Sequence, residues 1–146
     1  MDYTDVMDVL EALIIDVFRK TSEKCKVEQE NIGHAIQVPE SPFERVTYSQ
    51  ALDELKNNDI KLEFGDDLMD SHLRTLGEIH SGFYFLTDWP MKLKPFYIHE
   101  KDDDPTLSRS FDLQYGYLEL SSGGRRLHDP EQLKACLLYT SAAADE

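Results

Sequence analysis

The sequence predicts a single α+β domain in which an antiparallel sheet is flanked by helices. Apolar residues recur at helical spacing near the N-terminus, which predicts a long surface helix. The second half instead contains short runs of aromatic and aliphatic residues between turn residues, which is typical of strands. With 146 residues, of which 40% are hydrophobic, the chain is long enough to bury one core.

The first helix is predicted over residues 4–26, with Thr4 as its N-cap and lysines at its C-terminal end. The polar stretch Val27–Pro42 contains one glycine and two prolines, so it is predicted to be a connecting loop. A short strand over Arg45–Thr47 follows. The apolar residues of the first helix are expected to share one face: Val6, Leu10, Leu13, Ile14, Val17 and Phe18.

Capping signals place the later helices. Thr47 and Gln50 form a capping box that should open a helix reaching about Asn57. A second short helix is predicted over Asp67–Ile79. The run Asp129-Pro130-Glu131-Gln132 predicts the start of a last helix, because aspartate is a good N-cap and proline fits the first helical turn.

Strands are predicted in the second half of the chain, where apolar runs alternate with turns. One of these turns is the acidic run Asp102-Asp103-Asp104-Pro105, which is expected to be solvated rather than to bind a metal. The predicted strands are Phe83–Leu86, Pro95–His99, Arg109–Gln114 and Tyr117–Ser121.

The charge of the chain limits its partners. A formal net charge of −14 argues against a protein that coats nucleic acid, because phosphate binding needs a basic face. Cys25 and Cys136 have no metal-ligand spacing and are expected to be separate thiols in a reducing cytosol. No run has the length of a membrane span and no signal peptide is recognisable, so we expect a cytoplasmic location.

The hairpin after Ser110 carries two carboxylates among large apolar residues. If its loop is the pair Tyr115-Gly116, the register sets Asp112 directly opposite Glu119. Like charges at opposed, half-buried positions repel each other, and a bound cation removes this penalty. The pair therefore predicts a hard-cation site, most simply Mg²⁺ held together with a phosphate. The alternative is that both carboxylates face solvent.

The stretch Ser110–Arg126 resembles the late part of the catalytic domain of class II aminoacyl-tRNA synthetases, on the aspartyl, asparaginyl and lysyl branch. The pattern looks most like the archaeal and eukaryotic type of aspartyl-tRNA synthetase and covers residues 1–137. The resemblance implies a partial catalytic core whose parent activates aspartate with ATP and transfers it to tRNA. Further matching segments follow the order of the family: Phe43–Leu52, Gly65–Leu68, Phe85–Pro90, Lys94–Tyr97 and Arg126–Asp129.

The resemblance implies a site for ATP and its metal. Asp112 and Glu119 match acidic positions that lie at the ATP and its Mg²⁺ in the family, and Ser122 matches a hydroxyl near a second metal position. The chemistry of activation is an attack of the substrate carboxylate on the α-phosphorus. That reaction depends on positioning and charge neutralisation rather than on a protein nucleophile.

The resemblance also implies an amino-acid pocket. Arg126 matches the arginine that holds the side-chain carboxylate of aspartate, which suits a guanidinium because it can bind bidentately. Gly123 and Gly124 would let the substrate approach the backbone, and Lys94 lies near the same pocket. Arg125 departs from the glutamine or small residue that the family has there, so it bears on specificity.

Two signature motifs with phosphate-binding arginines and the anticodon-binding domain have no counterpart within residues 1–137. Residues 138–146 match nothing in the family, which fits an artefactual tail as well as a natural one. We therefore expect the chain alone to be inactive as an aminoacyl-tRNA ligase. The parent is expected to be a cytoplasmic homodimer that uses aspartate, ATP, Mg²⁺ and tRNA and does not bind membranes.

Two alternatives remain open from the sequence. The first is a fragment of asparaginyl-tRNA synthetase or of an asparagine-synthesising paralogue, towards which Ser122-Gly123-Gly124 leans slightly. The second is a non-catalytic module that uses an acidic surface to bind a partner.

Overall fold

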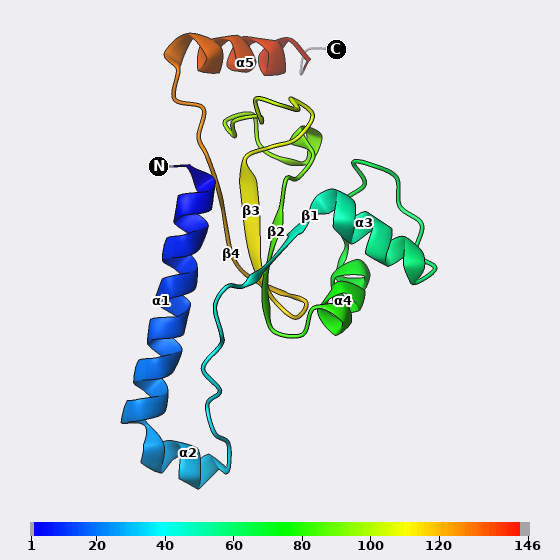
Figure 1. Ribbon diagram of the computed structural model, residues 1–146. Helices are drawn as coiled ribbons and strands as arrows, with labels where there is room; N and C mark the ends of the chain where they lie inside the picture. The colour runs from blue at the N-terminus through cyan, green and yellow to red at the C-terminus, as the bar shows by residue number, and fades with distance from the viewer. Residues whose placement is uncertain (1, 144–146) are drawn as a thin grey trace.

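The computed structural model describes residues 2–143, and their side chains as far as Leu138 (Figure 1). Its centre is a sheet of four strands in the order β1-β2-β3-β4. The outer strand β1 runs parallel to β2, whereas β2, β3 and β4 are antiparallel neighbours. The α+β class is thus confirmed, with one parallel pair in an otherwise antiparallel sheet. The strands are β1 (Glu44–Thr47), β2 (Phe83–Thr87), β3 (Ser110–Tyr115) and β4 (Leu118–Gly124).

The predicted first helix is present as α1 (Tyr3–Lys24), which begins one residue earlier than expected. Its N-cap is Asp2 rather than Thr4, because the Asp2 carboxylate accepts a hydrogen bond from the Tyr3 N–H at 2.8 Å. The predicted loop was wrong at its start, since α2 (Lys26–Ile32) occupies it. Gln29 donates to the Ser22 carbonyl at 2.9 Å and thereby ties α2 to the end of α1.

The capping box predicted for the next helix is confirmed. The Thr47 hydroxyl accepts from the Gln50 N–H at 3.2 Å, and the Gln50 side chain accepts from the Thr47 N–H at 2.9 Å, so α3 spans Tyr48–Asn57. The next helix, α4 (Asp70–Ile79), begins three residues later than predicted. A short 3₁₀ helix, η1 (Met91–Leu93), and a last helix, α5 (Pro130–Ala143), complete the secondary structure.

The N-cap predicted for α5 is also confirmed. The Asp129 carboxylate accepts from the N–H groups of Glu131 at 2.9 Å and Gln132 at 3.2 Å. No described helix is long and apolar enough to cross a membrane.

The segment Pro95–His99 is not a strand of the sheet, which corrects the prediction. Its Ile98 N–H donates to the Pro95 carbonyl at 3.0 Å, so the backbone turns instead of extending. Only isolated bridges join this region to its neighbours, between Ile98 and Arg126 and between Glu100 and Ser108. The turns nevertheless bring Lys94 and Tyr97 beside β3 and the end of β4.

Side chains of β2 point alternately to the two faces of the sheet, and each face is covered (Figure 1). On one face α3 and α4 bury a cluster that includes Tyr84 and Leu86. On the other face α1 packs Met7 against Phe85. The first cluster consists of Val46, Tyr48, Ala51, Leu55, Leu68, Leu76, Tyr84, Leu86 and Trp89. The second consists of Met7, Phe43, Phe85, Phe111 and Leu113.

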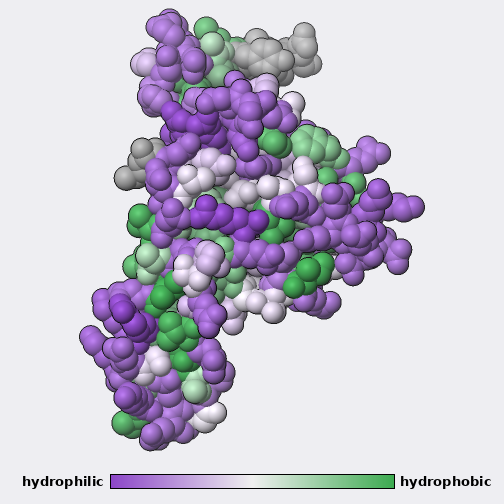
Figure 2. Space-filling model, viewed as in Figure 1, coloured by the Kyte–Doolittle hydropathy of each residue, from purple (hydrophilic) through white to green (hydrophobic). Residues whose placement is uncertain are grey.

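The apolar face predicted for α1 is only partly buried, which corrects the sequence prediction. Leu10 and Ile14 pack on the second cluster, as predicted, together with Met7, and the Phe18 ring lies 5.5 Å from the Phe83 ring. In contrast, Val6, Leu13 and Val17 stay exposed. Figure 2 shows hydrophobic surface among hydrophilic residues in the narrow lower part of the molecule, which contains α2 and the end of α1.

Candidate functional site

The β3–β4 hairpin differs from the predicted hairpin in its turn and register. Its two-residue loop is Gly116-Tyr117, closed by the pair Tyr115–Leu118. Gly116 has φ +58°, as the first central residue of a type II′ turn requires. The predicted loop, Tyr115-Gly116, had the glycine as its second residue, so every predicted pair between β3 and β4 was out of register.

The predicted pairing of Asp112 with Glu119 is therefore wrong. A bulge between Leu113 and Gln114 shifts the register, so Asp112 lies opposite Ser122, and Glu119 lies opposite Gln114. Asp112 and Gln114 are two residues apart on β3, so their side chains point to the same face, and residues paired across neighbouring strands also share a face. The two carboxylates consequently lie on the same face of the sheet, displaced along the strands.

Asp112 is the buried acid of this region, with only 7% of its side chain exposed. Burial raises the pKa of its carboxyl; the nearby charge of Lys94 lowers the pKa, and the charge of Glu119 raises it. The carboxylate is thus held in a position where a cation is needed to keep it ionised.

Lys94 supplies that cation in this structure. Its Nζ lies 3.2 Å and 3.4 Å from the two carboxylate oxygens of Asp112. The same ammonium lies 4.4 Å from the centre of the Trp89 ring, a cation–π contact. The backbone N–H of Lys94 donates to the Met91 carbonyl at 3.0 Å, so the end of η1 fixes where the side chain starts.

A pocket of about 180 Å³ gathers the residues predicted from the sequence. Glu119 lies outside its lining, on the exposed part of β4. Tyr97, which the sequence did not single out, contributes an aromatic wall. The predicted residues that line the pocket are Lys94, Asp112, Ser122, Gly123, Gly124 and Arg126.

Both glycines at the end of β4 are required by close packing. A Cβ on Gly123 would lie 2.8 Å from the Phe111 ring, and one on Gly124 would lie 2.9 Å from the Arg109 carbonyl oxygen. A larger residue at either position would force neighbouring atoms of β3 or Arg109 to shift. The pocket beside Asp112 therefore depends on these two positions.

Arg126 is an exposed residue that lines the pocket. Its guanidinium carbon is 4.3 Å from the centre of the Tyr97 ring, so the planar group lies over an aromatic surface. The Leu127 N–H donates to the Tyr97 carbonyl at 2.8 Å and fixes the two segments together. Within the described part of the chain Arg126 forms no ion pair, which leaves its charge available for an anion.

The donor set suits Mg²⁺ that is shared with a phosphate. The described residues contain no group of three metal-binding side chains, so the protein alone does not offer a closed metal cage. Asp112 supplies a carboxylate, Ser122 lies opposite with its hydroxyl, and Glu119 adds a second acid on the same face. Mg²⁺ typically takes one or two carboxylates and completes its shell with phosphates and water.

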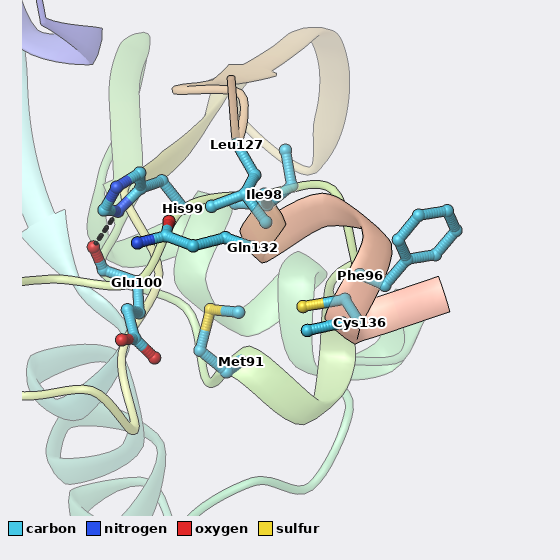
Figure 3. A pocket seen from close by; sticks show the side chains of 9 residues that line it. Met91, Phe96, Ile98, His99, Glu100, Leu127, Gln132 and Cys136 are labelled. Carbon is cyan, nitrogen blue, oxygen red and sulfur yellow. Dashed lines mark hydrogen bonds between the residues drawn. The ribbon is translucent and has the colours of Figure 1, made fainter. Parts of the chain in front are cut away.

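A second hollow, of about 360 Å³, lies between α5 and the loop that follows η1 (Figure 3). Met91, Phe96, Leu127 and Cys136 give it an apolar lining. It contains none of the predicted site residues. The smaller pocket at Asp112 is the candidate site, because it combines a buried acid with two cations.

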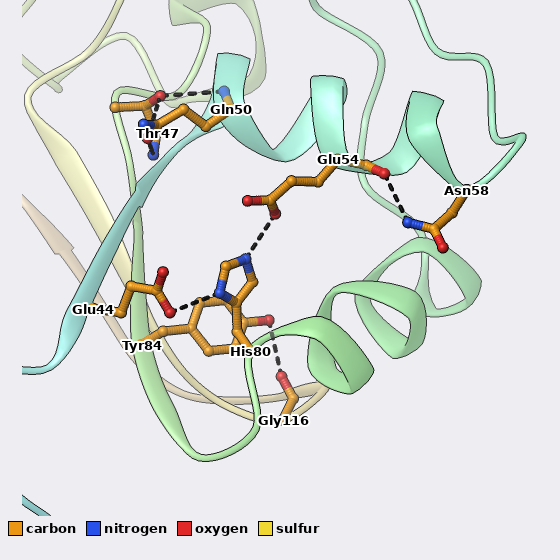
Figure 4. Close-up of polar contacts among 8 residues, drawn as sticks. All are labelled: Glu44, Thr47, Gln50, Glu54, Asn58, His80, Tyr84 and Gly116. Carbon is orange, nitrogen blue, oxygen red and sulfur yellow. Dashed lines mark hydrogen bonds and ion pairs between the residues drawn. The ribbon is translucent and has the colours of Figure 1, made fainter.

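Sequence reasoning missed a buried histidine that lies between two acids. His80, at the C-terminal end of α4, lies between Glu44 of β1 and Glu54 of α3 (Figure 4). The three residues are far apart in the sequence and have no motif spacing. Only the packing of α3 and α4 on the sheet reveals them.

A comparison with known protein families identifies the class of this domain. The family model of class II tRNA synthetases (D, K and N) matches residues 1–146. The fold and the match together define a class II aminoacyl-tRNA synthetase domain. The chain belongs to this family, on its aspartyl, asparaginyl and lysyl branch.

Curated relatives are aspartate–tRNA ligases of archaea. The chain is 44% identical over 132 residues to the aspartate–tRNA(Asp) ligase of Thermoplasma acidophilum, covering 90% of the chain and 31% of that protein. It is 41% identical to the aspartate–tRNA(Asp/Asn) ligase of Methanothermobacter thermautotrophicus, covering 91% of the chain and 30% of the relative. The chain thus spans about three tenths of the length of these relatives.

Solved structures share the fold. An aspartyl-tRNA synthetase from Entamoeba histolytica superposes with a TM-score of 0.84 at 29% identity, covering 96% of this chain and 30% of that one. Asparaginyl-tRNA synthetase from Pyrococcus horikoshii superposes with a TM-score of 0.85 at 30% identity, covering 97% of this chain and 35% of that one.

Proposed function

We propose that this chain forms the amino-acid pocket and part of the ATP site of an aspartate–tRNA ligase. The observation that carries the proposal is the pocket at Asp112, where one buried acid, one paired lysine and one free arginine meet. The parent enzyme would activate aspartate with ATP, release pyrophosphate and transfer the aspartyl group from aspartyl-adenylate to tRNA.

In this proposal Asp112, Glu119 and Ser122 hold Mg²⁺ on the phosphates of ATP. The shared face of β3 and β4 supports this role, because it lets both acids approach one bound nucleotide. Mg²⁺ held by these residues would supply charge neutralisation at the phosphates, which attack of the substrate carboxylate on the α-phosphorus requires. Asp112, Glu119 and Ser122 would thereby position and neutralise the nucleotide rather than form a covalent bond.

Arg126 would select the acidic side chain of aspartate. Its exposed guanidinium, oriented by the Tyr97 ring, is free to form two parallel hydrogen bonds with a carboxylate. Gly123 and Gly124 would leave room for the substrate along the backbone, and Lys94 would add a second positive charge to the pocket.

The partners follow from this activity. Aspartate, ATP and tRNA are the expected substrates of the parent, which we place in the cytoplasm as a homodimer without membrane contact. Because the chain itself has a net charge of −14, tRNA binding would rely on a local basic surface or on other parts of the parent.

Residues 1–137 form the synthetase part in this proposal, and residues 138–146 form the tail. The end of α5 runs into that tail, and residues 144–146 lie outside the described residues. The two signature motifs with phosphate-binding arginines and the anticodon-binding domain would come from the remainder of the parent.

A chimeric enzyme tests the function. Residues 1–137 replace the matching segment of the Thermoplasma acidophilum ligase, and aspartate-dependent pyrophosphate exchange is measured. We expect activity that is lost in Asp112→Ala, with a folded chimera by circular dichroism. A folded chimera that exchanges pyrophosphate with neither aspartate nor asparagine would contradict the proposal.

Asparagine is the second candidate substrate. The Pyrococcus horikoshii asparaginyl enzyme shares the fold across 97% of this chain, and the run Ser122-Gly123-Gly124 leans slightly towards the asparaginyl type. The same chimera distinguishes the candidates, because exchange would then depend on asparagine and not on aspartate.

A further inference from the structure

We propose that the Lys94 ammonium is an internal cation that occupies the charge position of the divalent metal at Asp112, and that Mg²⁺ binding displaces it. The inference rests on the proposed function, since it concerns the same metal position. It adds an exchange of one cation for another, in which a residue of the chain sets the metal affinity.

The contacts of Asp112 show that Lys94 already covers its carboxylate oxygens. Lys94 Nζ faces both carboxylate oxygens, at 3.2 Å and 3.4 Å, and neither is a short contact. The two side chains are largely buried, with 18% of Lys94 and 7% of Asp112 exposed. Little carboxylate surface remains for another ion. A divalent metal that binds these oxygens must therefore share them with the ammonium or replace it.

Electrostatics decides between sharing and replacement. With the ammonium in place, its single positive charge lies beside Asp112, and Glu119 lies further along the same face of the sheet. A metal ion added beside the ammonium would put a divalent and a monovalent cation a few ångströms apart. Repulsion at that distance in a partly buried site is large enough to change an affinity tenfold or more. Replacement avoids this cost.

The displaced ammonium has a place to go. Lys94 follows η1 directly and has a long, flexible side chain. It lines the 180 Å³ pocket together with Arg126. Movement away from Asp112 would take the ammonium off the Trp89 ring and into this pocket. An anionic substrate group, carboxylate or phosphate, would meet it there. Metal binding and anion binding would then favour each other.

The fluorescence of Trp89 can report the movement of the Lys94 ammonium. It is the only tryptophan in the chain, and the ammonium lies 4.4 Å from its ring centre. The ring is buried, so its emission depends on its immediate neighbours. Titration with Mg²⁺ alone should change the tryptophan fluorescence of the 146-residue chain in a saturable way. The change should be absent in Asp112→Asn and in Lys94→Met.

Mn²⁺ binding followed by electron paramagnetic resonance measures the affinity. Lys94→Met should bind Mn²⁺ at the Asp112 site about tenfold more tightly than the unaltered chain, because the competing charge is gone. Lys94→Arg keeps the charge and should bind as weakly as the unaltered chain. The matched control is Lys101→Met, which removes the same charge from the Lys101–Asp88 pair and should leave the Mn²⁺ affinity unchanged.

Several outcomes would overturn the inference. Equal or weaker Mn²⁺ binding in a folded Lys94→Met variant would show that lysine does not compete, and equal tightening in Lys101→Met would show a general charge effect. Mn²⁺ binding that persists in Asp112→Asn would also overturn the inference, as would the absence of Mn²⁺ binding in every variant. The proposed function is decided separately, by pyrophosphate exchange in the chimera, so the two can fail independently.

Discussion

Nε2 of His80 lies 2.7 Å from a carboxylate oxygen of Glu54, which joins the end of α4 to α3. Nδ1 of the same ring lies 2.7 Å from Glu44 on β1, and the Tyr84 ring of β2 packs on the imidazole (Figure 4). A neutral imidazole has only one N–H, so two ionised acceptors require the protonated ring. Burial lowers the pKa of His80, but its hydrogen bonds to Glu54 and Glu44 outweigh burial and raise it.

Stability should therefore fall as the medium becomes more alkaline. The unfolded chain has a histidine pKa near its ordinary value of about 6.5. The contribution of His80 to the free energy of unfolding is complete below that value and is lost as the pH rises through the raised pKa of the folded state. Urea unfolding from about pH 6 to about pH 9 measures this, and the decline should disappear in His80→Gln. The same slope in His80→Gln would show that another group titrates.

Glu11 should be a strong stabilising residue although it lies on a surface helix. It is 7% exposed, and its carboxylate accepts from the Phe43 N–H at 3.0 Å and from the Ser41 hydroxyl. Glu11→Ala leaves a buried N–H without a partner, which should cost about 1–3 kcal/mol of unfolding free energy in urea. Asp8→Ala breaks only an exposed pair with Arg45 and should cost less than about 1 kcal/mol. Similar losses in both would contradict this view of Glu11.

Gly123→Ala should destabilise the hairpin, because its Cβ would lie 2.8 Å from the Phe111 ring. We expect a loss of about 1–3 kcal/mol on thermal or urea unfolding, typical of overpacking. The neighbouring exposed Ser122→Ala should change stability by less than about 0.5 kcal/mol. If the two variants unfold alike, the close approach of β3 and β4 does not restrict position 123.

Arg126→Ala in the chimera should weaken the use of aspartate far more than the use of ATP. A charge-assisted pair contributes about 1.5–3 kcal/mol to binding. Its loss should raise the KM for aspartate in pyrophosphate exchange roughly ten- to hundredfold. Arg126→Lys should recover only part of this, since lysine cannot bind bidentately. Arg125→Ala is the neighbouring control. Equal effects on aspartate and ATP would mean that Arg126 does not select the amino acid.

Much of the fold follows from local signals in the sequence. The capping box at Thr47 and Gln50 and the N-cap at Asp129 involve residues three or fewer apart, so the sequence contains all the information. The period of α1 predicted its length for the same reason. Two of the segments that match the synthetase family, Lys94–Tyr97 and Ser110–Arg126, line the pocket at Asp112 together.

Other features depend on contacts that local patterns do not show. The bulge in β4 changes the register of the hairpin by a residue, and only the pairing with β3 reveals it. The histidine between Glu44 and Glu54 arises from the packing of α3 and α4 on β1. Pro95–His99 has the composition of a strand, but a turn hydrogen bond at Ile98 takes the N–H that a strand would use.

The packing of α1 has a consequence for how the chain reaches its fold. Its Met7 lies against Phe85, Phe111 and Leu113, which become one surface only after β2 and β3 have paired. The β3–β4 hairpin closes through a two-residue loop, so its formation requires little loss of loop entropy. Contacts between distant segments form more slowly than local ones. Although ribosomes make α1 first, its docking must wait until the hairpin and β2 have assembled, and until then its apolar side chains remain exposed to other chains.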